Sequence, residues 1–360
     1  MKKQKYMELN EKTIKKLDSA NVLGSVDLVP KQAAQAWNES RKVKVPASYR
    51  RATRIVVAGM GGSAIGPHLV RSLFYDKFYA PVQIINGYNL PAYTDEDTLV
   101  FLSSYSGTTE EVLSCAREAK AKRAKIMVLS GGGELAKLAK KYRWPAYIFE
   151  PKYNPCGQPR VGLGYAVFGT MGLLSRAGLV RISDTEATLM IKRLVTFARK
   201  FRFKSPATKN AAKKLAQKLK NKSVVLVGSE FLEGNMHIMA NQINETSKQY
   251  ATWALLPEID HHLLEGLSFP KRVKKDMIFV FFESSKYHPK VQKRYSLTAQ
   301  IVKRNKISTT SYKMKATTKL GQAAEAIMLG SYVSFYLGML NSQDPAFIPW
   351  VKFLKERLAK

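Results

Sequence analysis

Residues 104–109 crowd hydroxyl groups around a glycine directly after an apolar run. The segment reads SYSGTT and is followed by two glutamates. A helix that starts here turns free backbone N–H groups toward the same space as the hydroxyls, which favours an anion. The segment holds no lysine, so it is not a Walker-type loop. A helix cap explains one hydroxyl with a downstream glutamate, but not four or five hydroxyls. We therefore predict a phosphate-binding loop.

A second turn of this kind, GMGGSAIG, occupies residues 59–66 and also joins an apolar run to an expected helix. Glycines let the backbone approach a ligand closely, and Ser63 adds a hydroxyl donor. The spacing departs from G-x-G-x-x-G, and no acidic residue follows at the distance that a dinucleotide site requires. A tight strand-to-helix turn without a ligand is the alternative interpretation.

Glu245, within INETSK, and His261, within LPEIDHH, are the candidates for acid–base chemistry. A carboxylate and an imidazole can divide the work of base and acid if both face one pocket. From spacing alone, Glu245 could equally be a surface residue paired with Lys248, and His261 an ordinary loop residue. The final segment, DPAFIPWVKFLKERLAK, carries Lys352 and Lys355, which spacing alone assigns to a solvated helix face.

Alternating apolar runs and helical patterns must position these residues. Continuous apolar strands separated by helices indicate parallel sheets that are covered on both faces. Expected strands lie at residues 54–60, 82–86, 98–103, 125–129 and 146–149, and again at 223–228, 277–282 and 307–312, with an apolar segment at 250–256. The pattern predicts an α/β fold of two doubly wound parallel-sheet domains in tandem. We expect an N-terminal helical segment at 1–50, a phosphate-binding domain at 51–182, and a second domain with C-terminal helices at 183–360.

The net charge of +32 over 360 residues is the unusual feature of the composition. The lysines are spread over expected helix faces without a basic-aromatic motif, so we favour a solvated basic surface over a nucleic-acid partner. Steering of an anionic substrate is a further possibility. Cys115 and Cys156 are expected to be free thiols in a reducing cytoplasm. We expect no apolar run of membrane-spanning length, no secretory signal and no membrane partner.

Together these motifs resemble a known family. GMGGSAIG followed by SYSGTTEE resembles the sugar isomerase (SIS) domain, a flavodoxin-like fold. Further segments, in chain order, are LVPKQAAQAW, LSGGGELAKLAK, PRVGLGY, INETSK, LPEIDHH, GSYVSFYLGMLNSQDP and FLKERL. The whole series is similar to the bifunctional phosphoglucose/phosphomannose isomerases. The resemblance implies interconversion of glucose 6-phosphate, fructose 6-phosphate and mannose 6-phosphate, a homodimer with a shared active site, and no cofactor or metal.

The resemblance also assigns roles to residues at matching motif positions. The implied phosphate pocket consists of Ser63, Ser104, Ser106 and Thr109, with Gly61 and Gly62 along the sugar ring. Arg160 is expected to stabilise an enediolate, because a guanidinium suits a developing oxyanion. Glu245 is expected to be the base that moves the proton between C2 and C1. His261, from the second subunit, is expected to open the sugar ring, and Lys355 to assist at the ring oxygen.

The chain departs from its relatives at three places. The helix before Glu245 reads HIMANQINE, where relatives usually show an Arg-aromatic pair, and we expect this to change packing more than chemistry. His262 follows His261 where relatives often have asparagine, so His262 is an alternative for ring opening. Ala346 stands where many relatives carry a threonine that is linked to handling of the mannose epimer.

Two other functions remain open. One is a different SIS-type ketol isomerase, and the other is a non-catalytic sugar-phosphate sensor. INETSK with its downstream histidine argues against the first. The lack of a clear helix-turn-helix in the first 50 residues argues against the second.

Overall fold

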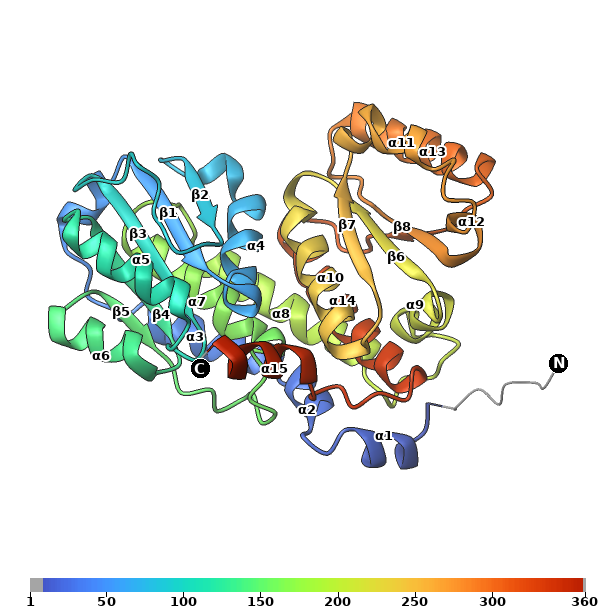
Figure 1. Cartoon of the computed structure of the whole chain (residues 1–360), viewed down its shortest axis with the longest axis horizontal. Coiled ribbons are helices and arrows are strands. Elements are labelled where there is room, and N and C mark those ends of the chain that lie inside the picture. The colour runs from blue at the N-terminus through green and yellow to red at the C-terminus, as the bar shows by residue number, and fades with distance from the viewer. Residues whose placement is uncertain (1–8, 359–360) are drawn as a thin grey trace.

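Five parallel strands form the first sheet of the computed structural model, which describes residues 9–358 (Figure 1). The strands are β1 (Arg54–Gly59), β2 (Val82–Ile85), β3 (Thr98–Ser104), β4 (Lys125–Ser130) and β5 (Ala146–Ile148). Their order in the sheet is β2-β1-β3-β4-β5, the order of a flavodoxin-like fold. The central strand β3 is buried along its whole length, as its continuous apolar sequence predicts.

Four parallel strands form the second sheet, in the order β7-β6-β8-β9. They are β6 (Ser223–Gly228), β7 (Ala251–Leu255), β8 (Met277–Glu283) and β9 (Ser308–Lys313). The order repeats that of the first sheet without its last strand. The prediction of two doubly wound parallel sheets is therefore confirmed, and the apolar segment at 250–256 contains a strand.

Helices cover both faces of the first sheet: α5 (Glu110–Ala121) and α6 (Gly133–Tyr142) on one face, and α4 (Ile65–Leu73) and α7 (Leu163–Arg176) on the other. Helix α3 (Val29–Ser40) packs on α7. The helices that precede it, α1 (Glu11–Leu17) and α2 (Val22–Asp27), contact the long helix α14 (Lys319–Leu340). Alternate strand residues point to opposite sides, so Val56 and Val100 pack with apolar residues of α5 and α6, whereas Ile55 and Leu99 pack with α3, α4 and α7. Pro30 stands in the first turn of α3, where its missing N–H costs no hydrogen bond.

The second half of the chain contributes the remaining helices. They are α8 (Asp184–Phe201), α9 (Ala211–Leu219), α10 (Glu233–Ser247), α11 (Leu263–Gly266), α12 (Val273–Asp276), α13 (Pro289–Arg304), α14 (Lys319–Leu340) and α15 (Pro349–Leu358). The sequence did not indicate α11 and α12, which have four residues each. Such short turns lack the apolar repeat by which a helix is recognised. The division of the chain at residues 50 and 182 stays a prediction.

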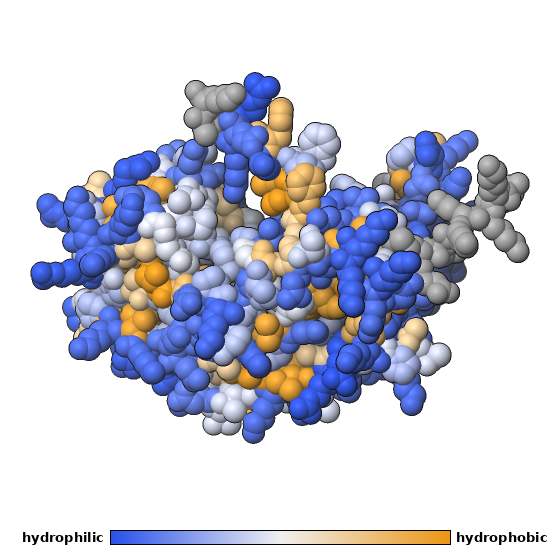
Figure 2. Space-filling view, turned by 90° about the horizontal axis from the view of Figure 1, so that it is seen from below, coloured by the Kyte–Doolittle hydropathy of each residue, from blue (hydrophilic) through white to orange (hydrophobic). Residues whose placement is uncertain are grey.

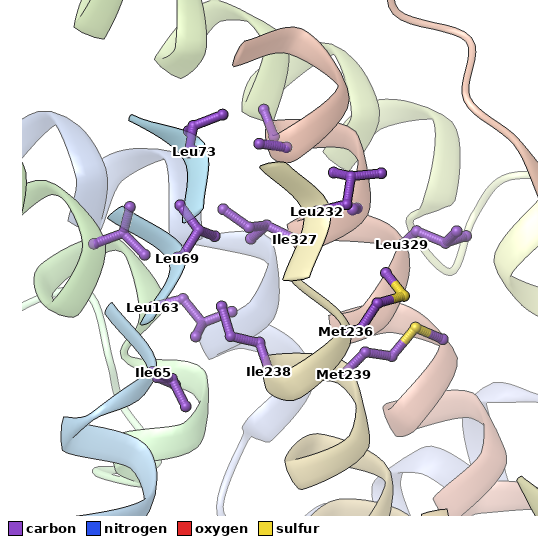
Figure 3. Packing of buried hydrophobic residues seen from close by; sticks show 14 of the residues in the cluster. Ile65, Leu69, Leu73, Leu163, Leu232, Met236, Ile238, Met239, Ile327 and Leu329 are labelled. Atoms are coloured by element: carbon purple, nitrogen blue, oxygen red, sulfur yellow. The ribbon is translucent and has the colours of Figure 1, made fainter. Parts of the chain in front are cut away.

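A continuous apolar core joins the two halves (Figure 3). Leu69 on α4 faces Ile238 on α10 and Ile327 on α14. Helix α10 begins with Gly234 in its first turn, and a Cβ added there would lie 2.4 Å from the Cα of Leu69. The absence of a side chain at this position lets α4 and α10 approach closely. The relative placement of the two sheets is thus set by packing and not by a flexible linker.

Helix α14 contradicts the expectation that no segment reaches membrane-spanning length. With 22 residues, α14 is long and apolar enough to cross a membrane by length and composition. The expectation was wrong on this point. However, the apolar window of α14 is entirely buried inside the protein, where it packs against α8, α9 and α10. A helix that is apolar all round is typical of the centre of a large core.

Two histidines meet where α4 packs on α10. The rings of His68 and His237 contact edge to face, with centroids 4.4 Å apart. Nε2 of His68 and Nδ1 of His237 are buried without a hydrogen-bond partner. Burial, then His237 and Arg71, lower the pKa of His68 to about 3, and burial and Arg71 lower the pKa of His237. His237 is the first residue of the HIMANQINE segment, and both rings are neutral at neutral pH.

Acid should therefore weaken the contact between the halves. The unfolded chain binds protons at these histidines below about pH 6.5, whereas the folded chain does not, so stability falls as pH drops from 6.5 toward 3. Because the folded protein keeps the His68 ring neutral, we expect the unfolding free energy to be about 2 kcal/mol lower at pH 5 than at pH 7.5. Denaturant unfolding of wild type and His68→Gln at both pH values measures the effect. His288→Asn, at an exposed histidine, is the control. An equal acid loss in all three proteins would contradict this explanation.

Candidate active site

The predicted phosphate loop follows β3 and leads into α5. Ser104 Oγ accepts a hydrogen bond from the Gly107 N–H (3.0 Å) and lies 2.8 Å from Thr109 Oγ1. Ser106 Oγ lies 3.0 Å from Thr108 Oγ1. Gly107 has a φ of +70°, which favours glycine, and a Cβ added there would lie 1.8 Å from the Gly132 carbonyl oxygen. The loop is thus held compactly, with Ser104 buried and Ser106 exposed.

The glycine-rich turn after β1 is bonded to this loop. Ser63 Oγ accepts a hydrogen bond from the Tyr105 N–H (2.8 Å), which leaves the Ser63 hydroxyl hydrogen free to donate elsewhere. Ser103 Oγ donates to the Ser63 carbonyl (2.7 Å). Gly61 has a φ of +47°, with open space around its Cα. The two segments expected to bind phosphate therefore form one surface at the carboxyl edge of the first sheet, where doubly wound folds bind ligands.

Arg160 is the most deeply buried charge near this surface, with 1% of its area exposed. All five of its N–H groups have partners. Nε donates to Thr246 Oγ1 (3.2 Å), Nη1 to Gln158 Oε1 (2.8 Å) and Glu245 Oε2 (3.4 Å), and Nη2 to the carbonyls of Pro345 (2.6 Å) and Ala346 (2.9 Å). The bond to Glu245 is the longest and so the weakest. Burial lowers the pKa of Arg160, but a guanidinium keeps its proton in proteins.

Glu245 lies in the last turn of α10 and forms the ion pair with Arg160. Its side chain is 31% exposed, so the carboxylate can meet a ligand. Burial raises the pKa of Glu245, and Arg160, Lys248 and Lys355 partly oppose that rise. A carboxylate whose pKa is raised toward neutrality is suited to act as a general base. Pairing of Glu245 with Lys248, the alternative from spacing, is not what we find.

The segment that carries Arg160 connects the glycine-rich turn after β1 with the helix of Glu245. A Cβ added to Gly62 would lie 2.9 Å from Pro159 Cβ and 3.2 Å from the Arg160 backbone nitrogen. The Arg160 carbonyl in turn accepts a hydrogen bond from Gln242 Nε2 on α10 (3.0 Å). The structure therefore brings together Gly62, Arg160 and Glu245, which are far apart in the chain.

Lys355 lies on α15 and acts on the same carboxylate. Its charge lowers the pKa of Glu245, whereas Lys352 lies 3.8 Å from Glu356 in an exposed ion pair. Of the two lysines that the sequence left open, Lys355 is the one that influences Glu245.

His261 does not join this group. It ends a turn (Glu258–His261) beyond the carboxyl end of β7, and it is exposed. Glu245 precedes the amino end of that strand, and five strand residues span about 15 Å. Across residues 9–358, no hydrogen bond or ion pair links His261 with Glu245 or Arg160. The alternative residue, His262, bonds to Glu258 through Nε2 (2.8 Å).

Sequence reasoning missed several partners of the site. Thr246, Gln158 and Gln242 hold Arg160, but a lone polar residue in a helix or loop gives no signal of its role. Lys248 was considered only as a partner for Glu245. Its Nζ instead donates to the Asp344 carbonyl, and its pKa is lowered to about 8 by burial and by Arg160. Its place three residues after Glu245 was the signal that could have singled it out.

The second half repeats the turn after β1 with different residues. Glu230 has a φ of +45°, and Gly61, at the same offset after its strand, has +47°. The Glu230 carboxylate accepts a hydrogen bond from the His288 N–H (2.8 Å), just before α13. The second turn thus supplies its own anion to the start of a helix, whereas the first turn has a glycine at that position.

A cavity of about 800 Å³ lies elsewhere between the halves. It is lined in part by Arg71, Tyr79, Phe231 and Lys319. The candidate site residues do not line it. The candidate site is thus distinguished by the buried and paired charges around Arg160 and not by cavity volume.

Comparisons with known proteins identify the family of this chain. Residues 208–358 match the family model of the bacterial phospho-glucose isomerase C-terminal SIS domain. The fold and this match define a protein of tandem SIS domains. The chain is 32% identical over 341 residues to the bifunctional phosphoglucose/phosphomannose isomerase of Caldicellulosiruptor bescii, covering 93% of this chain and 98% of that protein. It belongs to the family of bifunctional phosphoglucose/phosphomannose isomerases, and it is a sugar-phosphate isomerase.

Two further similarities concern the sequence and the fold. The enzyme of that name from Aquifex aeolicus is 28% identical over 85% of this chain and 90% of its own length. The crystal structure of a hypothetical protein from Thermus thermophilus superposes with a TM-score of 0.74 at 16% identity, covering 98% of this chain and 94% of the other. At that identity, the superposition supports the fold alone.

Replacing Gly107 tests the loop. We expect Gly107→Ala to lower the unfolding free energy by about 2 kcal/mol or more, because alanine is strained at this φ and meets the Gly132 carbonyl. We also expect loss of glucose 6-phosphate binding, measured by calorimetry. Gly87→Ala is the matched control, since a Cβ there meets nothing within 4 Å. Two variants of equal stability and equal affinity would contradict the assigned loop geometry.

Proposed function

We propose that this protein interconverts glucose 6-phosphate and fructose 6-phosphate, and mannose 6-phosphate and fructose 6-phosphate, through a cis-enediolate. The observation that carries the proposal is the buried guanidinium of Arg160, 3.4 Å from the Glu245 carboxylate, on a residue whose backbone lies against Gly62 of the predicted phosphate-binding surface. This arrangement combines an anchor for a phosphate, a base and a fixed positive charge. The base and the positive charge serve the proton transfer next to the carbonyl, and the anchor positions the substrate for it.

In this proposal, Glu245 moves the proton between C2 and C1. Removing a proton next to a carbonyl develops negative charge on the substrate oxygens, and a fixed cation stabilises that charge. Four of the five donors of Arg160 are held by short or buried bonds to other groups. The remaining Nη1–H makes the long bond to Glu245. When Glu245 takes up the proton of the substrate, this N–H can donate to the enediolate instead. Arg160 thus acts mainly as a charge fixed in place.

The loop at Ser104–Thr109 binds the phosphate and places the other end of the sugar under Glu245. Ser63, Ser106 and Thr109 contribute hydroxyls, with Gly61 and Gly62 along the ring. Neutral donors suit an enzyme that must also release its product. A basic surface of net charge +32 attracts sugar phosphates to the molecule (Figure 2 shows hydrophilic residues over most of one face).

Both epimers fit one mechanism. Glucose 6-phosphate and mannose 6-phosphate differ at C2, and a planar enediolate erases that difference. Ala346 adjoins the site through its carbonyl, which accepts a hydrogen bond from Arg160. Because alanine has no hydroxyl, this position cannot assist proton delivery to the mannose face, and we infer that the glucose reaction is the faster one. Independence of cofactor and metal and a cytoplasmic location remain predictions.

Glu245→Gln tests the base. We expect kcat with glucose 6-phosphate to fall about 10²–10⁴-fold while sugar-phosphate binding is kept, because the amide keeps the shape and cannot accept the proton. A coupled assay gives the rates, and calorimetry gives the affinity. Glu233→Gln is the control, because Glu233 lies on the same helix and is ion-paired with Arg71 away from the site. Unchanged turnover in Glu245→Gln would show that another group is the base, and failure of wild type on both sugars would exclude the isomerase.

We also propose a homodimer in which His261 enters the site of the neighbouring subunit. His261 and Glu245 lie beyond opposite ends of β7, so they cannot meet within one chain. The turn that carries His261 is nevertheless anchored firmly. Asp260 accepts hydrogen bonds from Arg294 (2.9 Å) and Thr298 (2.7 Å) of α13. An exposed imidazole on a fixed turn can be presented to a partner.

Mixing two inactive variants tests the shared site. His261→Ala and Glu245→Gln subunits, combined one to one, should regain about a quarter of wild-type activity. Half of the dimers then contain both subunits, and each mixed dimer has one complete site. The readout is glucose 6-phosphate turnover after co-expression, with each variant alone as the baseline. Activity no higher than the sum of the two baselines would place His261 outside a shared site.

A further inference from the structure

The segment at residues 344–346, which we call the C-terminal strap, is held from several sides. Arg160 Nη2 donates to the carbonyls of Pro345 and Ala346. Lys248 Nζ donates to the carbonyl of Asp344. The Asp344 carboxylate accepts the Ala346 N–H (2.7 Å) and the Phe347 N–H (3.2 Å), which closes a tight turn. Two cations and one carboxylate therefore fix a strap of three residues.

The strap decides where α15 lies, because α15 itself is little buried. Residues 350–358 are all exposed, including Trp350, Phe353 and Leu354. In Figure 1, α15 crosses the front of the molecule near the junction of the two halves. A ten-residue helix without a buried face gains little stability from packing. Yet Lys355 acts on the pKa of Glu245, so α15 is held close to the site.

Lys248 is well placed to hold the strap. It forms the C-terminal cap of α10 with a left-handed φ of +50°, so its direction is set by the end of the helix that carries Glu245. Its side chain is half-buried. The sequence places Lys248 one turn from Glu245, but the lysine turns away from that carboxylate to bond a backbone carbonyl nearly a hundred residues further along the chain.

We propose that Lys248 is a positioning residue: it fastens the C-terminal strap opposite Arg160 and thereby holds α15, with Lys355, over Glu245. This role rests on the proposed isomerase function only for its kinetic consequence. The structural consequence, a fixed α15, is independent of any substrate. Lys248 contacts no reacting atom, so its effect passes through the strap.

The charge of Lys248 adds a pH dependence. Burial and Arg160 lower the pKa of Lys248 to about 8, against the opposing effects of Asp344 and Glu245. Lys220, Lys222 and Asp276 line the same polar cavity as Lys248. Above about pH 8 the ammonium becomes an amine, and its bond to the Asp344 carbonyl loses the strength that charge gives. The strap should loosen in that range.

Limited proteolysis with chymotrypsin measures the strap directly, since Trp350 and Phe353 are exposed cleavage sites on α15. We expect Lys248→Met to be cut several-fold faster within α15 than wild type, and Lys248→Arg to be cut at the wild-type rate. Lys222→Met is the matched control, because Lys222 also donates to a backbone carbonyl, that of Lys275, in the same cavity. A second comparison, which needs no destabilised variant, is the cleavage rate of wild type and of Lys248→Arg at pH 7 and at pH 9.5. Only wild type should be cut faster at pH 9.5 than at pH 7.

Kinetics then test the route of the effect. With glucose 6-phosphate as substrate, we expect Lys248→Met to lower kcat/KM about tenfold. We expect wild type to lose activity above about pH 8. Lys248→Arg should keep the wild-type kcat/KM and should not show this loss. If Lys248 acts through α15, the double variant Lys248→Met/Lys355→Met should have a kcat/KM only a little lower than that of Lys355→Met alone.

Equal cleavage of wild type, Lys248→Met and Lys248→Arg would overturn the proposal, as would fully additive kinetic losses. If glucose 6-phosphate were not a substrate, the difference in cleavage would remain. The proposed function and the proposed strap can therefore fail separately.

Discussion

The guanidinium of Arg160 connects the parts of this molecule that lie furthest apart in sequence. Its partners come from its own turn, from α10 and from the segment after α14. Burying a cation is costly unless every donor is bonded, and here each of the five has an acceptor. A lysine could not meet this set, because it lacks the planar fork of donors. The site therefore requires α10 and the strap to be in place together.

That constraint explains why the halves are packed and not merely linked. Arg160 leaves the first half and reaches Glu245 of the second, so a small shift between the sheets would change the 3.4 Å distance. Close packing of α4 on α10 at Gly234 limits such shifts. A well-packed core resists small displacements, because each side chain fills a defined space. The geometry of the proposed catalytic pair is thus maintained by apolar residues that take no part in chemistry.

Much of the fold could be predicted from local patterns. Apolar runs ending in glycine or serine placed β1, β3 and β6 within a residue or two, since buried parallel strands leave a continuous signal. Arg160 and Glu245 became candidates through motif resemblance, but their contact depends on the packing of two halves. The bond from Lys248 to Asp344 and the contact of His68 with His237 left no local trace. Such contacts form between segments that are distant in sequence, and local sequence patterns do not predict them.

The two halves share a backbone turn but fill it differently. Glu230 takes up the left-handed conformation that glycine favours at Gly61, and its carboxylate bonds the backbone before α13. An anion that is tethered to the chain has a high effective concentration at its site, on the order of millimolar or above. A sugar phosphate would have to compete with that carboxylate in the second half, but not at the first turn, where we propose that the phosphate binds. The same backbone turn is thus occupied by the chain's own anion in one half and open to a ligand in the proposed site of the other.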